Sequence, residues 1–358
     1  MTTFYGLIGC GMMGREHLHN IALLKDAVVS VIYEPDKEMA KAAAALAPGA
    51  VFVDSVAALL AHQPLNCLVI VSPNHCHVEQ LEEIAKQVCL PILVEKPLFT
   101  AVDDLHRVMQ LKAHYGATIW VEMEYRYMPP MQEFIKMAAE VTGGLKMLTI
   151  TEHRFPFLEK VGNWNRFNKN SGGSFVEKCC HFFDLMRLII QSKPLSVYAS
   201  GGQDVNHLDE VYNGKKPDII DNAYVIVNFE NGARSLLELC MFAENSDMQE
   251  ELVATGNKGK IETSVPSDDS GKTSSNIRIG MRDGKTHVEN IEVDKKILEA
   301  GHHHGSTYYE HLAFLKAIEN NSDPEVSLED GLIAVAVGEA AEQSIKQGRL
   351  INLEEIIN

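Results

Sequence analysis

The sequence lacks the features of a membrane or secreted protein. None of its apolar runs approaches the 18 residues that a membrane-spanning helix needs. The first nine residues contain no basic segment followed by a long apolar stretch and a small-residue cleavage site, so no secretory signal is expected. We therefore predict a cytoplasmic protein that does not bind a membrane.

Paired cysteines are also missing. The seven cysteines are an odd number and include no C-x-x-C pair. This pattern argues against a disulfide framework or a zinc site and favours reduced thiols. Cys179 and Cys180 are neighbours, which are poorly disposed for an unstrained disulfide, so we expect them to pack in the interior.

Positive charge is scarce. The 358 residues include 32 Lys and Arg against 49 Asp and Glu, which gives a formal net charge of −17. Such a surface repels phosphate backbones and anionic lipids, so we expect no nucleic-acid partner. An anionic cofactor is still compatible with this charge, because the N–H groups at a helix N-terminus can hold one.

Short apolar strands alternate with helices in the first third of the chain. Strands are expected at 4–9, 28–33, 51–53, 67–71, 91–94 and 118–121, with helices between them and Ser55 as a helix cap. Unbroken apolar strands are typical of a parallel sheet covered on both faces. The fold class is therefore α/β, and residues 1–122 are predicted to form a Rossmann domain with a doubly wound parallel sheet.

The pattern changes after Tyr125. Longer strands with alternating apolar residues are expected at 146–155, 195–201, 223–229, 233–241, 250–255 and 260–263, and Asn231-Gly232 is a strong hairpin signal. The polar segment Ser264–Ser275 is predicted to be a mobile loop, and helices are expected at 307–320 and 329–347. Residues 123–358 are thus predicted to form a second, α+β domain with a mostly antiparallel open sheet for substrate binding and oligomerisation.

A glycine-rich motif, G-x-G-x-x-G, follows the first predicted strand and opens a helix. Its residues are Gly9, Cys10, Gly11, Met12, Met13 and Gly14. The first glycine permits the tight turn, the second lets the backbone approach a pyrophosphate, and the third lets helix and strand pack closely. A glycine-rich turn without a nucleotide is the alternative interpretation.

An acidic residue ends the next strand, at the place where dinucleotide-binding domains bind the ribose. Glu34 can accept hydrogen bonds from both ribose hydroxyls and would repel a 2′-phosphate. The sequence therefore predicts NAD, rather than NADP, as the cofactor.

Three further motifs complete a recognisable set. Ser72–His77 reads Ser-Pro-Asn-His-Cys-His, Glu95–Pro97 reads Glu-Lys-Pro, and Ser171–Leu185 contains G-G-x-x-x-E-x-x-x-H-x-x-D. The first two follow parallel strands at their carboxyl ends, where open α/β sheets bind ligands. With the glycine motif, they make nearly the whole chain resemble the glucose–fructose oxidoreductase, inositol dehydrogenase and MocA (Gfo/Idh/MocA) family.

The resemblance implies an enzyme. Members of the family consist of a Rossmann domain and a mostly antiparallel α/β domain, and most of them transfer a hydride between NAD and a hydroxyl or carbonyl group of a sugar or cyclitol. It also implies a homodimer or homotetramer, with the exposed face of the second sheet as the interface. Further cofactor contacts are expected from Ser72, Pro73, Asn74, His77, Glu95 and Lys96.

The same resemblance assigns the catalytic residues. Lys96 contacts the reacting hydroxyl and the nicotinamide ribose, and His181 is the acid/base candidate. Glu177 replaces the family's usual aspartate, so the pocket should differ from that of the inositol dehydrogenases, and myo-inositol is not assigned. One helical turn would place Glu177 beside His181, to orient its imidazole or bind another substrate hydroxyl.

Several residues have weaker assignments. His75 and His77 are expected to pack the following helix or contact substrate, and Asp184 is expected to be structural. His302-His303-His304 suggests a substrate-edge loop rather than a metal site, because consecutive side chains diverge, and no metal is predicted. Substrate contacts are expected from Tyr125, Arg126, Arg154, Trp164, Arg166 and Asn168.

The sequence thus predicts an NAD-dependent dehydrogenase acting on a small sugar, sugar acid or cyclitol. Two alternatives remain open at this point. One is an NAD-dependent glycosidase, because some members of the family use transient oxidation to eliminate a glycosidic group. The other is a non-catalytic NAD-binding regulator, which would have no need of Lys96 and His181.

Overall fold

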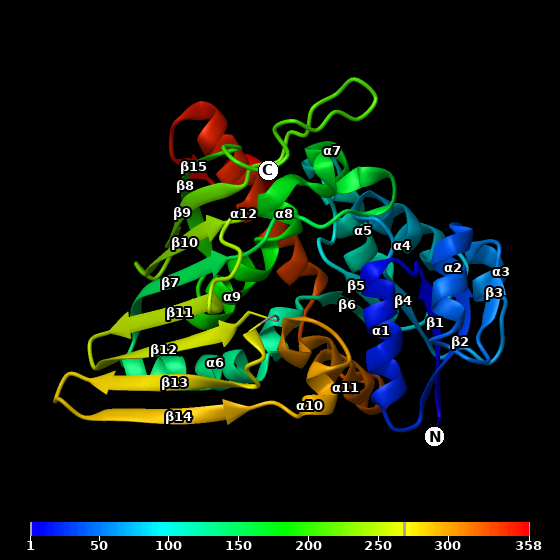
Figure 1. Cartoon of the computed structure of the whole chain (residues 1–358), viewed down its shortest axis with the longest axis horizontal. Helices are drawn as coiled ribbons and strands as arrows, with labels where there is room; N and C mark the ends of the chain where they lie inside the picture. The colour runs from blue at the N-terminus through cyan, green and yellow to red at the C-terminus, as the bar shows by residue number, and fades with distance from the viewer. Residues whose placement is uncertain (1, 268–269, 358) are drawn as a thin grey trace.

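The computed structural model describes residues 2–267 and 270–357, which form two sheets (Figure 1). The first sheet has six strands in the order β3-β2-β1-β4-β5-β6, and every strand pair is parallel. Its strands are β1 (Thr3–Ile8), β2 (Ala27–Tyr33), β3 (Val51–Val53), β4 (Cys67–Ile70), β5 (Ile92–Glu95) and β6 (Ile119–Glu122). This strand order is that of a dinucleotide-binding Rossmann fold.

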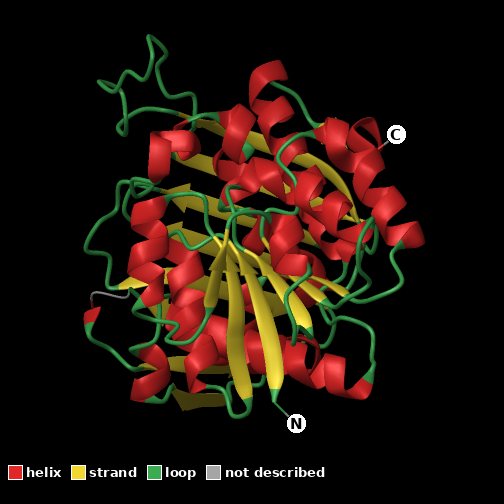
Figure 2. Ribbon diagram, turned by 90° about the vertical axis from the view of Figure 1, so that its right-hand side faces the viewer, coloured by secondary structure: helices red, strands yellow, loops and turns green. Residues whose placement is uncertain are grey.

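Helices cover both faces of this sheet (Figure 2). They are α1 (Met12–Leu23), α2 (Lys37–Ala44), α3 (Val56–Leu60), α4 (His77–Ala85) and α5 (Leu105–His114). All residues of β4, β5 and β6 are buried, which explains why these strands are apolar apart from Glu95 and Glu122 at the ends of β5 and β6. The hydroxyl of Ser55 accepts a hydrogen bond from the N–H of Ala58, so the predicted cap of α3 is confirmed.

The second sheet has nine strands in the order β14-β13-β12-β11-β7-β10-β9-β8-β15. Its pairs are antiparallel except for β7 and β10, and the predicted hairpin at Asn231-Gly232 joins β9 to β10. The strands are β7 (Leu145–His153), β8 (Pro194–Gly202), β9 (Asn222–Phe229), β10 (Arg234–Cys240), β11 (Met248–Gly256), β12 (Gly259–Pro266), β13 (Ser274–Met281), β14 (Thr286–Glu292) and β15 (Ile351–Asn352).

One face of the second sheet is covered by α6 (Pro129–Thr142), α9 (Cys180–Ile190) and α12 (Leu328–Gln347). Figure 1 shows α6 and α9 behind the strands. The other face has no helix among the described residues, so side chains on this sheet alternate between the core and the exposed face. The predicted fold class, a parallel Rossmann sheet followed by a mostly antiparallel open sheet, is confirmed.

The segment after β12 differs from its prediction. The expected loop Ser264–Ser275 begins with three residues of β12 and ends with two residues of β13, while residues 268–269 lie outside the described part. Strands β13 and β14 were not predicted. β14 is almost wholly exposed and reads Thr-His-Val-Glu-Asn-Ile-Glu, so it offers no row of buried apolar residues to detect.

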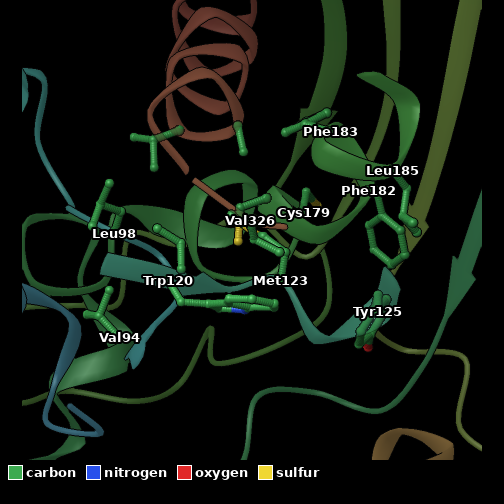
Figure 3. Packing of buried hydrophobic residues seen from close by; sticks show 14 of the residues in the cluster. Val94, Leu98, Trp120, Met123, Tyr125, Cys179, Phe182, Phe183, Leu185 and Val326 are labelled. Carbon is green, nitrogen blue, oxygen red and sulfur yellow. The ribbon is translucent and has the colours of Figure 1, made fainter. Parts of the chain in front are cut away.

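The C-terminal helices return to the first sheet and join the two halves. Trp120 of β6 donates from its indole N–H to Glu310 of α11 (Ser306–Asn320) at 2.7 Å, and the N–H of Val121 donates to the carbonyl of Val326. Figure 3 shows Trp120 and Met123 close to Cys179 and Val326. The hydrophobic core is therefore continuous between the two sheets. No helix in the described ranges is both long enough and apolar enough to cross a membrane.

Candidate active site

The glycine-rich loop connects β1 to α1 and depends on its glycines in different ways. Gly9 has a φ of +99°, and a Cβ there would lie 2.6 Å from the carbonyl oxygen of Val71. A Cβ on Gly14 would lie 2.6 Å from the carbonyl oxygen of Gly9. No described atom lies within 4 Å of a Cβ built on Gly11, so the space above this residue is open to a ligand.

The N-terminus of α1 fits an anion. No described side chain caps this helix, and its first turn has no acidic residue. By contrast, Asp36 caps α2 and Ser327 caps α12. The free N–H groups of α1 are thus suited to hold the pyrophosphate of a dinucleotide.

Glu34 lies beside the same loop. Its carboxylate accepts hydrogen bonds from the N–H of Cys10 at 2.6 Å and from the N–H of Asp36 at 2.9 Å. These two bonds fix the carboxylate at the end of β2, where the adenosine ribose is bound in dinucleotide-binding folds. The loop, the uncapped helix and this carboxylate together fit NAD.

The segments after β4 and β5 are tied to each other by His77. This histidine is fully buried, and its two ring nitrogens lie 2.8 Å from the carbonyl oxygen of Pro97 and 3.0 Å from that of Ser72. Burial lowers the pKa of His77, whereas hydrogen bonds to the two carbonyl oxygens act in the opposite direction. The side-chain amide of Asn74 donates to the carbonyl of Ser171 and so links this region to the second domain. His77 and Asn74 thus position loops.

The remaining predicted cofactor contacts in this region also have partners within the protein. Ser72 donates its hydroxyl to Gln80 at 2.6 Å, and Pro73 precedes the 3₁₀ helix Asn74–Cys76. Glu95 is 5% exposed, and its carboxylate accepts from the N–H of Lys96 and lies 3.5 Å from Nε2 of His17. Glu95 therefore lies in the interior below the pocket, where it contributes to the electrostatic environment of Lys96.

Lys96, Glu177 and His181 line one pocket at the carboxyl end of β5. The pocket lies between the glycine-rich loop and the second domain. Its lining residues are Met12, Met13, Lys96, Glu124, Arg154, Phe157, Leu158, Lys160, Glu177, Lys178, His181 and His303. The structure thus brings together the three predicted catalytic residues and the predicted contacts Met12, Met13 and Arg154.

Lys96 is held as a cation. Its ammonium group donates to the backbone carbonyl of Glu177 at 3.1 Å. Burial alone would lower the pKa of Lys96, but the neighbouring charges of Glu95, Glu177 and Glu124 raise the pKa above its ordinary value. An ammonium group has three donors, so others remain to hold a substrate oxygen.

His181 is held neutral. Its ring stacks on the ring of Tyr125 with centroids 4.1 Å apart, and its Nε2 lies 3.8 Å from a carboxylate oxygen of Glu124. Its Nδ1 is buried and has no hydrogen-bond partner among the described residues. Burial, reinforced by the positive charge of Lys96, holds the pKa of His181 well below its usual value. A neutral imidazole with an unused nitrogen is suited to accept a proton.

Glu177 lies close to one cationic side chain of the second domain. Lys160 lies 3.3 Å from one of its carboxylate oxygens, and the other oxygen has no hydrogen-bond partner in the described part of the chain. Glu177 and His181 were expected to share a helix face if one helix contained both, and this condition is not met. α8 (Gly173–Glu177) ends at Glu177 and α9 begins at Cys180, so a break at Lys178 and Cys179 separates the two residues.

Two predicted substrate contacts lie behind the pocket wall. Tyr125 is fully buried beneath His181, and its hydroxyl accepts a hydrogen bond from Lys178. Arg126 donates from its Nε and Nη2 to Asp184 at 2.5 Å in each case, and from its Nη1 to the carbonyl of Glu325. Neither side chain lines the pocket. Arg126 and Asp184 form a buried ion pair, and the expected substrate contact of Arg126 stays a prediction.

Three further predicted contacts lie outside the pocket lining. The guanidinium of Arg166 is 2% exposed and donates to Glu210. Asn168 is held through its backbone N–H, which donates to Asp218. The ring of Trp164 packs beneath the ammonium of Lys160, 4.6 Å from the ring centroid, and edge-on against His75. Trp164 thus contacts a lining residue, Lys160, and the expected substrate contacts of all three residues stay predictions.

Sequence reasoning missed Glu124, Lys178, Lys160 and His303 as pocket residues. Glu124 begins the 3₁₀ helix η3 (Glu124–Tyr127) two residues after β6, so the rule that ligands bind at the carboxyl ends of parallel strands would have found it. His303 was expected only to belong to a substrate-edge loop. It lies 3.2 Å from the carboxylate of Glu124, and this neighbour overcomes the effect of burial and raises the pKa of His303 to about 9.

Two groups of buried ligand-type residues lie near the pocket. Glu16, Glu124 and His303 form one, and His17, Glu95 and Glu122 form the other. Within each group the ligand atoms lie within 4.8 Å of one another. In both groups the histidine lies close to a carboxylate, at 3.2 Å for His303 and at 3.0 Å from Glu122 for His17, so protons can provide the positive charge. The sequence-based expectation of a site without metal stays a prediction.

A larger cleft of about 430 Å³ lies elsewhere, between the end of α5, the start of β6 and the segment before α12. It contains none of the glycine-rich loop, Glu95–Pro97 or Ser171–Leu185 residues. The residues that the motifs single out for catalysis therefore line the pocket around Lys96 and not this cleft.

Known proteins share this architecture. Residues 4–123 match the family described as "Oxidoreductase family, NAD-binding Rossmann fold", and residues 137–353 match "Oxidoreductase family, C-terminal alpha/beta domain". The oxidoreductase YrbE of Bacillus subtilis is 26% identical over 98% of this chain and 96% of its own. An inositol 2-dehydrogenase of Rhizobium meliloti is 25% identical over 99% of this chain and 100% of its own.

A solved levoglucosan dehydrogenase, in complex with NADH and levoglucosan, shares the fold. It superposes with a TM-score of 0.82 over 99% of this chain and 100% of its own, at 18% identity. The two family matches together cover most of the chain, including the glycine-rich loop and every lining residue of the pocket except Glu124. The chain therefore belongs to the Gfo/Idh/MocA family of oxidoreductases, with an NAD-binding Rossmann domain at its N-terminus.

Proposed function

We propose that this protein is an NAD-dependent dehydrogenase that interconverts a hydroxyl and a carbonyl group on a sugar, sugar acid or cyclitol. One observation carries the proposal: Lys96, His181 and Glu177 line the same pocket as Met12 and Met13 of the glycine-rich loop. Relatives named inositol 2-dehydrogenase and levoglucosan dehydrogenase support the class of substrate. When NAD is bound, it supplies the hydride acceptor.

Residues of the protein accept the proton that leaves the substrate hydroxyl. Removing a hydride from a carbinol carbon requires that the hydroxyl proton leave as well. Neutral His181 accepts this proton, and the ammonium of Lys96 donates a hydrogen bond to the oxygen that becomes the carbonyl. The free carboxylate oxygen of Glu177 binds a second hydroxyl of the substrate. In the reducing direction, the protonated histidine returns its proton to the oxygen.

The proposed cofactor is NAD rather than NADP. The carboxylate of Glu34 is fixed at the end of β2 by the N–H groups of Cys10 and Asp36. A negative charge at this position accepts hydrogen bonds from ribose hydroxyls and repels a 2′-phosphate.

The experiment is a spectrophotometric screen for NADH formation with sugars, sugar acids, inositols and glycosides. We expect turnover with NAD by the wild-type protein, reduced by about 10²–10⁴-fold in Lys96→Ala and His181→Ala. Lys136→Ala is the matched control, because this lysine is exposed on α6, outside the pocket lining. Tight NAD binding without turnover of any compound would contradict the proposal, and glycoside cleavage without net NADH would support the NAD-dependent glycosidase instead.

A further inference from the structure

The pocket is positively charged although the whole chain is strongly acidic. Five basic residues line it, namely Lys96, Arg154, Lys160, Lys178 and His303, against the two carboxylates of Glu124 and Glu177. Burial and the charge of Arg154 lower the pKa of Lys178, so its charge is the weakest of the five. The chain as a whole carries a formal net charge of −17. Cations are thus concentrated at this pocket, where a partly desolvated charge acts far more strongly than on the surface.

Neighbouring groups neutralise only part of this charge. Lys160 lies 3.3 Å from Glu177, and Lys178 lies 3.0 Å from Glu152, which is buried behind the wall. Burial and the charge of Glu152 raise the pKa of Glu250 to about 8, so this nearby carboxyl group adds no negative charge at neutral pH. The negative charge of Glu95 acts on Lys96, so the least balanced part of the pocket is the side where Arg154 and Lys178 share the single carboxylate of Glu152.

Arg154 has donors that no described residue uses. Its Nε is buried without a hydrogen-bond partner, and its nearest carboxylate, Glu152, lies 3.5 Å from Nη1. Its guanidinium otherwise lies over the ring of Phe155, 4.6 Å from the centroid. A planar guanidinium offers paired donors that match the two oxygens of a carboxylate.

The backbone fixes Arg154 at the pocket. Its N–H donates to the carbonyl of Cys240, and its carbonyl accepts from the N–H of Ala243. Six residues later, Lys160 is placed by its contacts with Trp164 and Glu177. Both cations therefore come from one ordered segment of the second domain, whereas Lys96 comes from the first.

The cofactor does not explain these two cations. Its pyrophosphate is suited to the free N–H groups of α1, on the Rossmann side of the pocket. The oxygen at the reacting carbon is accounted for by Lys96. A hydroxyl of a neutral polyol can accept from Arg154, but it leaves this arginine to share the carboxylate of Glu152 with Lys178, whereas a negatively charged group on the substrate supplies a carboxylate of its own.

We propose that the substrate is a carboxylate-bearing polyol, that is a sugar acid, whose carboxylate is bound by Arg154 and Lys160 while Lys96 and His181 act on one of its hydroxyls. This inference rests on the proposed dehydrogenase function and narrows its substrate class. Glu177, which pairs with Lys160, then binds a hydroxyl between the two ends of the substrate. The paired donors of an arginine bind either a carboxylate or a phosphate, and we assign the anion as the carboxylate of a sugar acid, which the sugar phosphate in the test below distinguishes from a phosphate.

The test compares matched acids and neutral compounds. D-galacturonate, D-glucuronate and D-gluconate are assayed with NAD beside the methyl esters of the two uronates, D-glucitol and D-galactose 6-phosphate. We expect kcat/KM for an acid to exceed that for its neutral counterpart by about 10–100-fold, the range of a charged hydrogen bond. Neutral compounds or the sugar phosphate turned over as well as the acids would overturn the inference but leave the dehydrogenase function intact.

Two variants test whether Arg154 and Lys160 cause the preference for acids over their esters. In Arg154→Met, the ratio of kcat/KM for acid over ester falls by about tenfold or more, chiefly through KM for the acid, and Lys160→Met lowers the same ratio. Lys136→Met, at an exposed position of α6, is the control and keeps the wild-type ratio. An unchanged ratio in both pocket variants would overturn the proposal.

A binding measurement covers the case in which no compound is turned over or Arg154→Met does not fold. The wild-type protein loaded with NADH is titrated calorimetrically with D-galacturonate and with its methyl ester. Tighter binding of the acid, weakened in Lys160→Met, supports the inference independently of turnover. Acids that bind no more tightly than their esters would overturn it, whereas the absence of turnover alone counts against the dehydrogenase function.

Discussion

At the scale of single residues, the charge state of His181 determines how the proposed reaction depends on pH. Oxidation needs this imidazole in its neutral form, and burial with the charge of Lys96 holds its pKa well below its ordinary value. We therefore expect kcat/KM for oxidation to be constant across neutral pH and to fall only in acid, about tenfold for each pH unit below that pKa. An acid limb centred above pH 7 would contradict the assignment of His181.

Substitution of His303 tests the direction in which the pKa of His181 changes. Its pKa of about 9 makes it a cation at neutral pH, and its charge lowers the pKa of His181. His303→Gln removes the charge and frees Glu124, which raises the pKa of His181. The acid limb of the pH profile should therefore move to higher pH in this variant. A limb that stays in place or moves to lower pH would show that the two histidines do not interact.

Glu34 gives a second prediction at the same scale. Glu34→Gln keeps an oxygen to accept from the N–H of Cys10 but removes the charge that repels a 2′-phosphate. We expect the ratio of the NADP to the NAD dissociation constant to fall by about tenfold or more, which corresponds to roughly 1.4 kcal/mol. Calorimetric titration with each cofactor measures this ratio. If the ratio is unchanged, another group determines the cofactor preference.

The sequence predicted residues at the carboxyl ends of strands better than those that approach from other elements. Lys96 and the glycine-rich loop follow β5 and β1 directly, so their positions were implied by the chain order. Arg126 illustrates the limit, because its residue type is equally suited to bind a substrate or to form a buried ion pair. Only tertiary packing places Asp184 beside it. His303 likewise reaches the pocket from a segment about 180 residues after Glu124.

At the scale of elements, different glycines of the turn between β1 and α1 are needed for cofactor binding and for folding. A Cβ at Gly11 meets no described atom, whereas a Cβ at Gly14 lies 2.6 Å from the carbonyl oxygen of Gly9. We expect Gly11→Ala to fold normally and to bind NAD about tenfold more weakly or worse, because its methyl group enters the space of the pyrophosphate. Gly14→Ala should lower the free energy of unfolding by about 1–3 kcal/mol, as overpacking does.

Urea denaturation and calorimetric NAD titration of the two variants test this distinction. Equal losses of stability in Gly11→Ala and Gly14→Ala would contradict it. So would full NAD affinity in Gly11→Ala, because the pyrophosphate would then lie elsewhere.

The ion pair of Arg126 and Asp184 joins η3 to α9. Both side chains are buried, and Arg126 also donates to the carbonyl of Glu325 ahead of α12. Asp184→Ala leaves the buried guanidinium with only the more distant carboxylate of Asp330, 3.5 Å from its Nη2, and should lower the free energy of unfolding by about 3 kcal/mol. Glu133→Ala on the exposed side of α6 is the control and should change stability much less. A small effect in Asp184→Ala would mean that the structure relaxes around Arg126.

At the scale of the whole molecule, the exposed face of the second sheet is the part that a single chain leaves uncovered. Tyr198, Ile226 and Leu236 are cross-strand neighbours on β8, β9 and β10, and they point away from α9 and α12. The exposed fractions of Tyr198 and Ile226 are 44% and 41%, and Tyr224 on the same face is 56% exposed. Apolar side chains gathered on one open face are typical of an interface between protein chains.

The sequence already predicted this face, because alternating apolar and polar residues require an antiparallel sheet with one solvated side. It could not predict how the chain's C-terminal helices return to the first sheet, because that depends on contacts such as Trp120 with Glu310 across 190 residues. Those contacts explain why the pocket is built from both halves and why α11 covers α1 rather than the open face.

We therefore predict that two copies of the chain associate through the open sheet. A self-complementary patch of this kind favours a symmetric dimer, which can pair again into a tetramer. Ile226→Glu places a charge in the middle of the apolar row, so the variant should be monomeric in light scattering while keeping its fold, because the side chain is already 41% exposed. Lys136→Glu, on the helix-covered side, is the matched control and should keep the wild-type mass. A wild-type monomer at micromolar concentration, or an Ile226→Glu variant with the wild-type mass, would show that the open face is not the interface.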